Sequence, residues 1–412
     1  MTIRVAAIEV SHWHALHDAA YLRHLVAMPE VELVAIQDSD AGLVARRAAE
    51  VGSPPTFTDY RQMLATTRPD FVVALGRHRQ MAGIAHDLLD QGYPFLMEKP
   101  MGINAAEVEA VAAKAARLDA FVAVPLAQRY TPFATRAREL LAVARFGPLS
   151  HIYVRLNRPG PARYQTWDCA WMLDPAEAGG GCLRNLGPHG LDMFLHLTGE
   201  EAQVTGAQLS RRAHERPVED YASVMLRSVS GILGTVEVGN GFPRDGTDGE
   251  WKIAGRDAIL TMKDGIMKLA TAEGDETLPG ANVTAPAFTA LRDALDHWRR
   301  GAAPPISVHD CARVVRLIDQ AYPSTRCAGH GMAQPSGGGD RRLPRDRPRN
   351  SAILGATWRR SVRKLCHASR CGRGPGCRDY DGGRTGYRSD GRRCRLDRSR
   401  GDGRPPRRNW AR

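Results

Sequence analysis

The chain has 412 residues, which is more than a single hydrophobic core usually serves, so its length predicts at least two domains. Hydrophobic residues make up 43% of it, and no apolar run approaches the roughly 20 residues of a membrane helix. These features exclude a collagen-like chain, a small disulfide-stapled scaffold and a membrane-spanning protein.

The formal charge of +12 is unevenly distributed along the chain. Residues 324–412 hold 23 Arg and one Lys against seven Asp, a balance of +17, which leaves −5 for residues 1–323. We assign an Arg- and Gly-rich tail to residues 323–412, because this stretch has too few apolar residues to form a core. It can be a disordered extension, a nucleic-acid-binding arm or a sequence read out of frame. Aromatic residues that could stack on bases are sparse in it, so we favour the last interpretation and do not expect a nucleic-acid partner.

In the first part of the chain, short apolar segments alternate with segments of helical periodicity. The expected strands are Ile3–Ile8, Val31–Ile36, Phe71–Leu75, Phe95–Met97 and Phe121–Val124. The expected helices are His12–Met28, Ala41–Val51, Tyr60–Thr66, Met81–Gln91 and Ala105–Leu118. Strands that are apolar on both faces and alternate with helices predict a parallel sheet wrapped by helices over residues 1–125. Such a sheet binds its ligands at the carboxyl ends of its strands.

Farther along, several segments have the period-two alternation of strands exposed on one face. The expected strands are His151–Leu156, Gln203–Leu209, Ala222–Leu226, Gly234–Val238, Trp251–Ala254 and Ala258–Met262, and the expected helices are Pro188–Leu197, Phe288–Arg299 and Val308–Tyr322. Turn sequences between the strands indicate antiparallel pairing. The fold class is therefore α/β, with an N-terminal domain built on a parallel sheet and, over residues 126–322, a C-terminal α+β domain with a large, mostly antiparallel open sheet.

Cysteine and histidine spacings indicate neither a disulfide framework nor a metal site. Cys169, Cys182 and Cys311 form no C-x-x-C pair, which favours a reducing, cytoplasmic compartment. Histidines 12, 14 and 17 start a predicted helix without converging on one ion, so we expect no metal.

The turn after the first strand tests whether the sheet binds a dinucleotide. A G-x-G-x-x-G fingerprint would bring backbone N–H groups to a pyrophosphate, but the window reads Glu9-Val10-Ser11-His12-Trp13-His14. Ser11 could cap the next helix, whose N-terminus would still attract phosphate, whereas the Glu9 carboxylate would repel it. Asp38 ends the second strand, where a carboxylate binds both ribose hydroxyls and disfavours a 2′-phosphate, which predicts NAD rather than NADP. Asp38 could also cap the helix that follows it.

Two later segments carry residues suited to proton transfer. Glu98-Lys99-Pro100 ends a strand, and a partly desolvated lysine there can hold a substrate oxygen or move a proton. The run Gly179-Gly180-Gly181 precedes Asn185, His189 and Asp192, of which the last two would share one face of a helix. A purely structural role for this histidine remains an alternative.

These motifs, in this order, resemble the Gfo/Idh/MocA family of NAD(P)-dependent oxidoreductases over about residues 1–322. The similar features are Glu98-Lys99-Pro100, the glycine run with Gly187, His189 and Asp192, Trp171 and Asp174-Pro175 before it, and Gln128-Arg129-Tyr130. The resemblance implies a Rossmann domain followed by a domain for substrate and oligomer contacts, whose open sheet often forms the interface between subunits.

The resemblance also implies residue roles. Lys99 would hold the reacting hydroxyl, His189 would take its proton, and Asn185 stands where the family commonly has Asp. Cofactor contacts would come from Val10, Ser11, His12, Asp38, Gly76, Arg77, His78, Glu98 and Lys99, and substrate contacts from Arg129, Trp171 and Asp192. The segment Gly76-Arg77-His78 replaces the family's usual Thr-Pro-rich loop.

The sequence thus predicts a cytoplasmic homo-oligomeric enzyme that uses NAD, or less favourably NADP, to oxidise a hydroxyl of a sugar, cyclitol or sugar acid by hydride transfer. One alternative is a lyase or glycosidase of the same fold that oxidises its substrate only transiently. Another is a relative that binds nucleotide or ligand with little or no turnover. Glu9 and Asn185 favour this last alternative, whereas Lys99 and His189 disfavour it.

Overall fold

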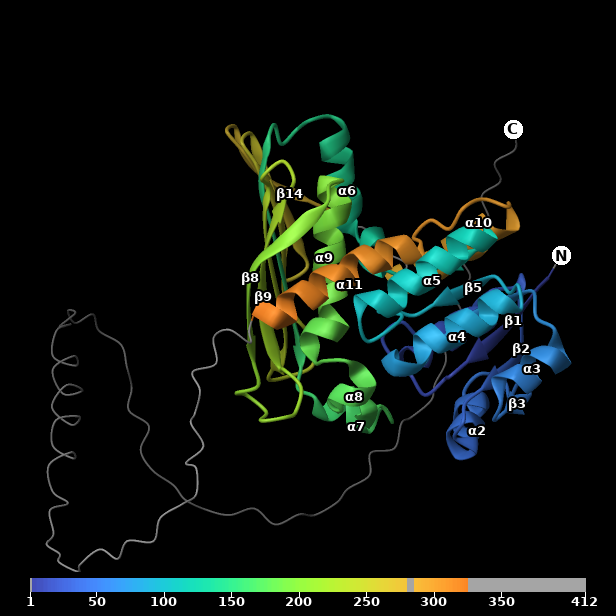
Figure 1. The fold of residues 1–412 in the computed structure, drawn as a ribbon. Coiled ribbons are helices and arrows are strands. Elements are labelled where there is room, and N and C mark those ends of the chain that lie inside the picture. Colours follow the sequence, from blue (N-terminus) through green and yellow to red (C-terminus); the bar gives the residue numbers. More distant parts are fainter. Residues whose placement is uncertain (1, 280–284, 325–412) are drawn as a thin grey trace, which may run out of the picture. The chain divides into compact units, whose positions relative to one another are not determined.

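The computed structural model describes residues 2–279 and 285–324, and two sheets organise this part of the chain (Figure 1). The tail predicted over residues 323–412 lies outside the described residues from position 325 onward. Within the described ranges, no helix has both the length and the apolar character needed to cross a membrane.

The first sheet has six parallel strands in the order β3-β2-β1-β4-β5-β6. The strands are β1 (Ile3–Ile8), β2 (Val31–Gln37), β3 (Thr56–Phe57), β4 (Phe71–Ala74), β5 (Phe95–Met97) and β6 (Val122–Ala123). The strand order reverses between β1 and β4, and the crevice at such a switch point is where doubly wound sheets bind ligands. The predicted Rossmann fold is confirmed.

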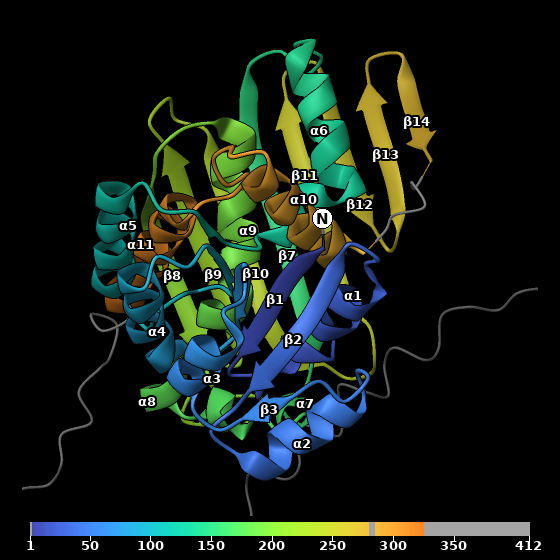
Figure 2. The ribbon, with the colours of Figure 1, turned by 90° about the vertical axis from the view of Figure 1, so that its right-hand side faces the viewer.

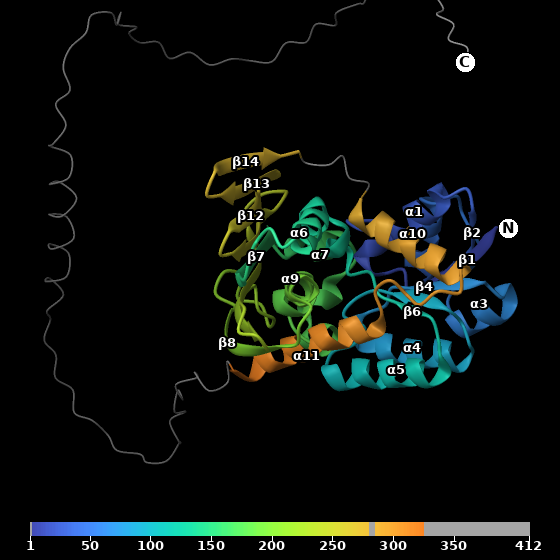
Figure 3. The same ribbon diagram turned by 90° about the horizontal axis from the view of Figure 1, so that it is seen from above.

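Helices cover both faces of this sheet (Figure 3). One face carries α3 (Tyr60–Thr67), α4 (His78–Asp90), α5 (Ala105–Leu118) and the start of α11 (Val308–Ser324). The other carries α1 (Tyr21–Ala27), α2 (Ala41–Ala49) and α10 (Pro286–Arg299). In β1, β4 and β5, successive buried residues enter opposite cores, which explains why these strands are apolar throughout.

The second sheet has eight strands in the order β14-β13-β12-β11-β7-β10-β9-β8. They are β7 (Leu149–Pro159), β8 (Ala202–Ser210), β9 (Tyr221–Ser228), β10 (Leu233–Phe242), β11 (Asp248–Gly255), β12 (Ala258–Lys263), β13 (Ile266–Thr271) and β14 (Gly274–Leu278). All pairs are antiparallel except β10 with β7, so the predicted sheet type is confirmed. Helices α6 (Pro132–Ala142) and α9 (Cys182–Thr198) pack on one face, and α11 contacts both α9 and α5.

Between β7 and α9 the chain forms three short helical pieces. These are α7 (Ala162–Thr166), the 3-10 helix η3 (Ala170–Leu173) and α8 (Pro175–Ala178). We call residues 160–178 the cover segment, because they pack on the carboxyl end of the first sheet. Figure 2 shows the arrowheads of β1 and β2 directed toward α7 and α8.

Two helix predictions need correction. The helix expected over His12–Met28 is wrong: a 3-10 helix, η1 (Trp13–Ala15), is followed by α1 only from Tyr21. Asp18 and Ala20 have positive φ angles of 51° and 46°, which interrupt a continuous helix. Helix α9 begins at Cys182, so Pro188 lies inside it instead of starting it.

Candidate active site

A cavity of about 360 Å³ lies where the carboxyl ends of β1 and β5 meet α9. Its walls include the three predicted catalytic residues, Lys99, Asn185 and His189. Asn185 and His189 follow Lys99 by 86 and 90 positions in the sequence. The fold therefore brings distant residues together at the edge of the sheet where a Rossmann fold binds its ligands. Other residues with polar groups on its walls include Trp13, His14, Asp18, Tyr21, Glu98, Gln128, Arg158 and Arg163.

Lys99 is buried at the floor of this cavity. Its Nζ donates hydrogen bonds to the Asn185 carbonyl oxygen at 2.8 Å and to Asn185 Oδ1 at 2.9 Å. Glu98 Oε1 lies 3.9 Å from the same nitrogen. Burial lowers the pKa of Lys99, and the Glu98 carboxylate opposes this shift. A lysine of lowered pKa beside a cavity can hold a substrate oxygen and exchange a proton with it.

Helix α9 is fixed at its N-terminus by Glu219. The Glu219 carboxylate accepts hydrogen bonds from the Gly181 and Leu183 N–H groups at 2.8 and 3.0 Å, so it satisfies donors that a helix start leaves free. A Cβ on Gly181 would lie 2.1 Å from the Glu219 carbonyl oxygen, and glycine is required for this approach. The cap places Asn185 and His189 on the cavity side of the helix.

Asn185 and His189 differ in their partners. Asn185 Nδ2 donates to the Tyr164 hydroxyl at 2.8 Å, so this amide links Tyr164 to Lys99. His189 is half-buried, and its Nδ1 has no hydrogen-bond partner among the described residues. Burial, with Lys99 nearby, holds the pKa of His189 well below its usual value, so its imidazole is neutral at physiological pH.

The turn after β1 uses its own backbone donors. Glu9 has a positive φ of 54°, and its N–H donates to Gln37 Oε1 at 3.2 Å. The Val10 N–H donates to the Gln37 carbonyl at 3.1 Å, and the Ser11 N–H to Asp38 Oδ2 at 2.6 Å. The end of β2 therefore takes the hydrogen bonds that a glycine-rich turn would offer to a pyrophosphate.

Two capping predictions at this turn are wrong. His12, and not Ser11, caps the next helical turn, because His12 Nδ1 accepts from the His14 N–H at 3.1 Å. Asp40, and not Asp38, caps α2. Asp38 Oδ1 instead accepts from the Asp40 N–H at 3.0 Å.

Glu9 is less of an obstacle to phosphate than its charge suggests. Burial, reinforced by the nearby Asp38, raises the pKa of Glu9 to about 7. A large fraction of this carboxyl group is therefore protonated at neutral pH, which removes much of the repulsion expected from the sequence.

The cover segment packs directly on this turn. Trp167 stacks on His17 with ring centroids 5.3 Å apart, and Cys169 Sγ lies 3.0 Å from the Ser11 carbonyl oxygen. The loop after β4 is held in the same way, since His78 Nδ1 lies 2.8 Å from the Ala178 carbonyl oxygen. All the predicted cofactor residues are buried except the half-buried Arg77, whose side chain lies 3.8 Å from Glu177.

The residues at this edge nevertheless fit a polar ligand. Four buried side-chain atoms, Ser11 Oγ, His12 Nε2, His78 Nε2 and Trp171 Nε1, have no hydrogen-bond partner in the part of the chain that the structure describes. Buried polar groups are normally paired, so such a cluster is typical of a site whose ligand completes the hydrogen bonds. Ser11, His12 and His78 are predicted cofactor residues, and residues of the cover segment pack on all three of them.

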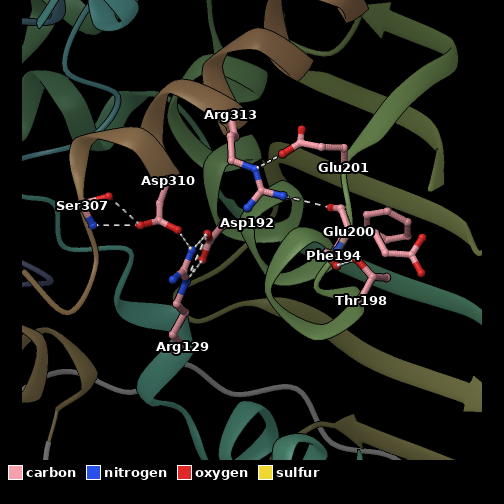
Figure 4. Close-up of polar contacts among 9 residues, drawn as sticks. All are labelled: Arg129, Asp192, Phe194, Thr198, Glu200, Glu201, Ser307, Asp310 and Arg313. Carbon is pink, nitrogen blue, oxygen red and sulfur yellow. Dashed lines mark hydrogen bonds and ion pairs between the residues drawn. The ribbon is translucent and has the colours of Figure 1, made fainter. Parts of the chain in front are cut away.

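The three predicted substrate residues do not line the cavity. Arg129 binds Asp192 and Asp310, with Nη2–oxygen distances of 2.6 and 2.9 Å (Figure 4). Asp192 lies on the same helix as His189, as predicted, but its carboxylate is buried in this cluster and does not line the cavity. Trp171 instead packs between His78 and His12, with ring centroids 5.1 and 5.8 Å away.

Sequence reasoning missed His14 as a cavity residue. Its Nδ1 lies 3.1 Å from Glu98 Oε2. The signal was present, since His14 occupies the last glycine position of the absent fingerprint, where a side chain must enter the ligand crevice.

In the described ranges, no group of three His, Cys, Asp or Glu side chains is arranged to hold a metal ion.

Comparisons with known proteins match both domains. A model described as an oxidoreductase family with an NAD-binding Rossmann fold covers residues 10–125, and one for the GFO/IDH/MocA C-terminal domain covers residues 134–261. A levoglucosan dehydrogenase, solved in complex with NADH and levoglucosan, superposes with a TM-score of 0.71 and 19% identity over 80% of this chain and 98% of that one.

Relatives matched by sequence are more similar in identity but cover a smaller share of this chain. Trans-1,2-dihydrobenzene-1,2-diol dehydrogenase of Bos taurus is 27% identical over 220 residues, covering 53% of this chain and 63% of the relative. The scyllo-inositol 2-dehydrogenase (NADP(+)) IolW of Bacillus subtilis is 25% identical over 264 residues, covering 58% of this chain and 72% of that protein. The matches thus span less than two thirds of the length of the dihydrodiol dehydrogenases. With both domain models matched in order and both predicted sheets present, the chain belongs to the GFO/IDH/MocA family of oxidoreductases.

Proposed function

We propose that this chain is an NAD(P)-dependent dehydrogenase that oxidises a hydroxyl group of a sugar, cyclitol or sugar acid. The convergence of Lys99 and His189 on one cavity at the carboxyl edge of the Rossmann sheet carries the proposal. Relatives that act on a dihydrodiol and on an inositol support a substrate with neighbouring hydroxyl groups. When bound, the nicotinamide supplies the hydride acceptor.

The cavity residues suit such a substrate. Lys99 Nζ would hold the oxygen of the reacting hydroxyl, and His189 and Asn185 would bind hydroxyl groups next to it. The charged side chains of Asp18 and Arg158, which form an ion pair at 2.9 Å on the cavity wall, offer further hydrogen bonds. Trp13 gives the same cavity an apolar wall against which the carbon face of a ring can pack.

For the cofactor, the end of β2 favours NAD over NADP. The carboxylates of Asp38 and Asp40 both lie there, and a 2′-phosphate placed beside them would be repelled. Since Asp38 already accepts two backbone hydrogen bonds, we infer that it binds ribose hydroxyls only with its remaining lone pairs.

The test is a screen for reduced nicotinamide. The purified chain is incubated with NAD or NADP and a panel of sugars, cyclitols and sugar acids, and absorbance of the reduced cofactor is followed. We expect turnover with NAD, and Lys99→Met should lower kcat by at least about 100-fold while dinucleotide binding, measured by tryptophan fluorescence, persists. Binding without turnover on any substrate would instead support the ligand-binding alternative, and full activity of Lys99→Met would remove Lys99 from the reaction.

We also propose that two copies associate through the outer face of the second sheet. Met225, Leu233, Ile259 and Ile266 are exposed, and the strand registers place all four on the face opposite α9. Four large apolar side chains on one sheet face are typical of an interface. The three buried cysteines are free thiols, which supports the cytoplasm as the compartment.

A further inference from the structure

The cavity holds a second imidazole, His14, and the Glu98 carboxylate lies within ion-pair distance of it. His14 Nδ1 lies 3.1 Å from Glu98 Oε2, and both side chains line the cavity. Beside His189, the position where the family commonly has Asp is occupied by Asn185, whose amide already binds Lys99 and Tyr164. An amide cannot stabilise an imidazolium as a carboxylate does.

The surroundings of the Glu98 carboxyl group favour its ionised form. Glu98 is 1% exposed, yet its pKa is lowered, because the effects of His14, Lys99 and the Tyr21 hydroxyl outweigh the cost of burial. A buried carboxylate held next to an imidazole fixes the ring's tautomer, with the proton on the nitrogen that faces the carboxylate, and stabilises the ring when it gains a second proton. Because His14 Nδ1 lies beside Glu98, Nε2 is the ring nitrogen left to meet a substrate.

His14 and His189 are both half-buried, so exposure does not distinguish them. His14 differs from His189 in the charged groups around its ring. The groups that face it are Glu98 and Lys99 from the end of β5, Tyr21 from α1, Asp18 and His12 from its own segment, His78 from the start of α4 and His189 from α9. Glu98 lies nearest among the carboxylates, whereas Lys99 is the charge that acts most strongly on His189.

We propose that His14, oriented by Glu98, accepts the proton of the reacting hydroxyl, and that His189 binds the substrate. The O–H bond breaks and its proton passes to His14 Nε2. The C–H bond on the same carbon breaks with its electron pair, which leaves as hydride to NAD(P)⁺, and a C=O bond forms. His14 then releases its proton to water. In this chain the acid–base pair has moved from α9 to the turn after β1 and the end of β5. The proposal rests on the dehydrogenase function proposed above.

Chemical rescue tests the role of His14. His14→Ala removes the imidazole and leaves room beside the cavity, and general-base loss should lower kcat by about 10²–10⁴-fold with KM changed less than about threefold. Added imidazole should raise the kcat of His14→Ala at least about tenfold, and this increase should saturate as the imidazole concentration rises. His189→Ala is the matched control: it should raise KM and should not be rescued. Unchanged kcat in His14→Ala, or rescue of His189→Ala alone, would overturn the proposal.

Proton NMR tests the pair without turnover. A ring N–H hydrogen-bonded to a carboxylate gives a resonance far downfield, and we expect one in the wild-type chain that is lost in His14→Ala and Glu98→Gln. It should persist in Asp18→Asn, which removes a different carboxylate from the same cavity. A resonance that survives Glu98→Gln, or that disappears only in His189→Ala, would overturn the proposal. If the resonance behaves as expected but the wild type reduces no cofactor, the proposed dehydrogenase function fails, and the catalytic role of the pair fails with it. If the wild type is active and His14→Ala is fully active too, the proposed function stands and only the role of His14 is refuted.

Discussion

At the residue scale, the turn after β1 shows how this chain replaces a glycine fingerprint. Glu9, Ser11 and His14 stand at the three glycine positions. The Glu9 and Ser11 N–H groups donate to the end of β2, and the His14 ring lies 3.1 Å from the Glu98 carboxylate. The missing glycines could be read from the sequence, as could Lys99 and His189. The partners of these residues could not, since Gln37, Asp38 and Glu98 approach the turn only when separate strands align in the sheet.

Glu9 should make stability depend on pH. Because its pKa is raised to about 7, the folded chain holds this proton more tightly than the unfolded chain, so the stabilisation is full below the ordinary value of 4.5 and is lost as pH rises through 7. Glu9→Gln should match the wild type near pH 4 and exceed it by about 1–3 kcal/mol at pH 8, measured by urea unfolding. Glu32→Gln, an exposed carboxylate on β2, controls for loss of charge. Parallel stability curves for Glu9→Gln and the wild type would contradict this expectation.

At the scale of elements, the strands of the first sheet were predictable and the cover segment was not. Ile3–Ile8 and Phe95–Met97 are buried on both sides, so they appear as continuous apolar runs in the sequence. Residues 160–178 form helices of only four or five residues, whose position depends on contacts such as Trp167 with His17, far apart in sequence. Local periodicity contains no signal for such packing.

The cover segment should compete with the dinucleotide. A stacked aromatic pair contributes about 0.5–1.5 kcal/mol, so Trp167→Ala should favour withdrawal of the segment and tighten NAD binding by about two- to tenfold. Fluorescence titration and stopped-flow association measure the affinity and the rate. His24→Ala removes a ring pair with Phe288 outside the segment and should bind NAD like the wild type. Unchanged or weaker binding by Trp167→Ala would contradict the competition.

At the scale of the molecule, one face of the second sheet is buried in a core and the other carries exposed residues. Val154, Val224, Val236 and Ile253 point into the core with α9, and the alternate residues point outward. The sequence predicted this sheet from its period-two alternation, and one sheet face open to a partner followed from it. Which apolar residues gather on that face depends on strand order, since β9, β10, β12 and β13 are not all consecutive neighbours.

Association through this face is checked by measuring mass in solution. Met225→Glu places a charge among exposed apolar side chains, so desolvation of that charge should oppose assembly. Sedimentation equilibrium should give a multiple of the 45.1 kDa chain mass for the wild type and a lower mass for Met225→Glu. Leu118→Glu, at an exposed leucine on α5, should keep the wild-type mass. A wild type of single-chain mass would refute the interface.

The cap on α9 also reaches the far end of the described chain. The Tyr322 hydroxyl donates to Glu219 Oε1 at 2.9 Å, the same oxygen that receives the Gly181 and Leu183 N–H groups. A Cβ on Gly180 would lie 1.9 Å from that hydroxyl, so the tyrosine ring seats against the bare backbone. A C-terminal truncation that removes Tyr322 would thus take away one of the contacts that hold the start of the helix carrying Asn185 and His189. A C-terminal tag or fusion partner should therefore follow Tyr322 and should not replace it.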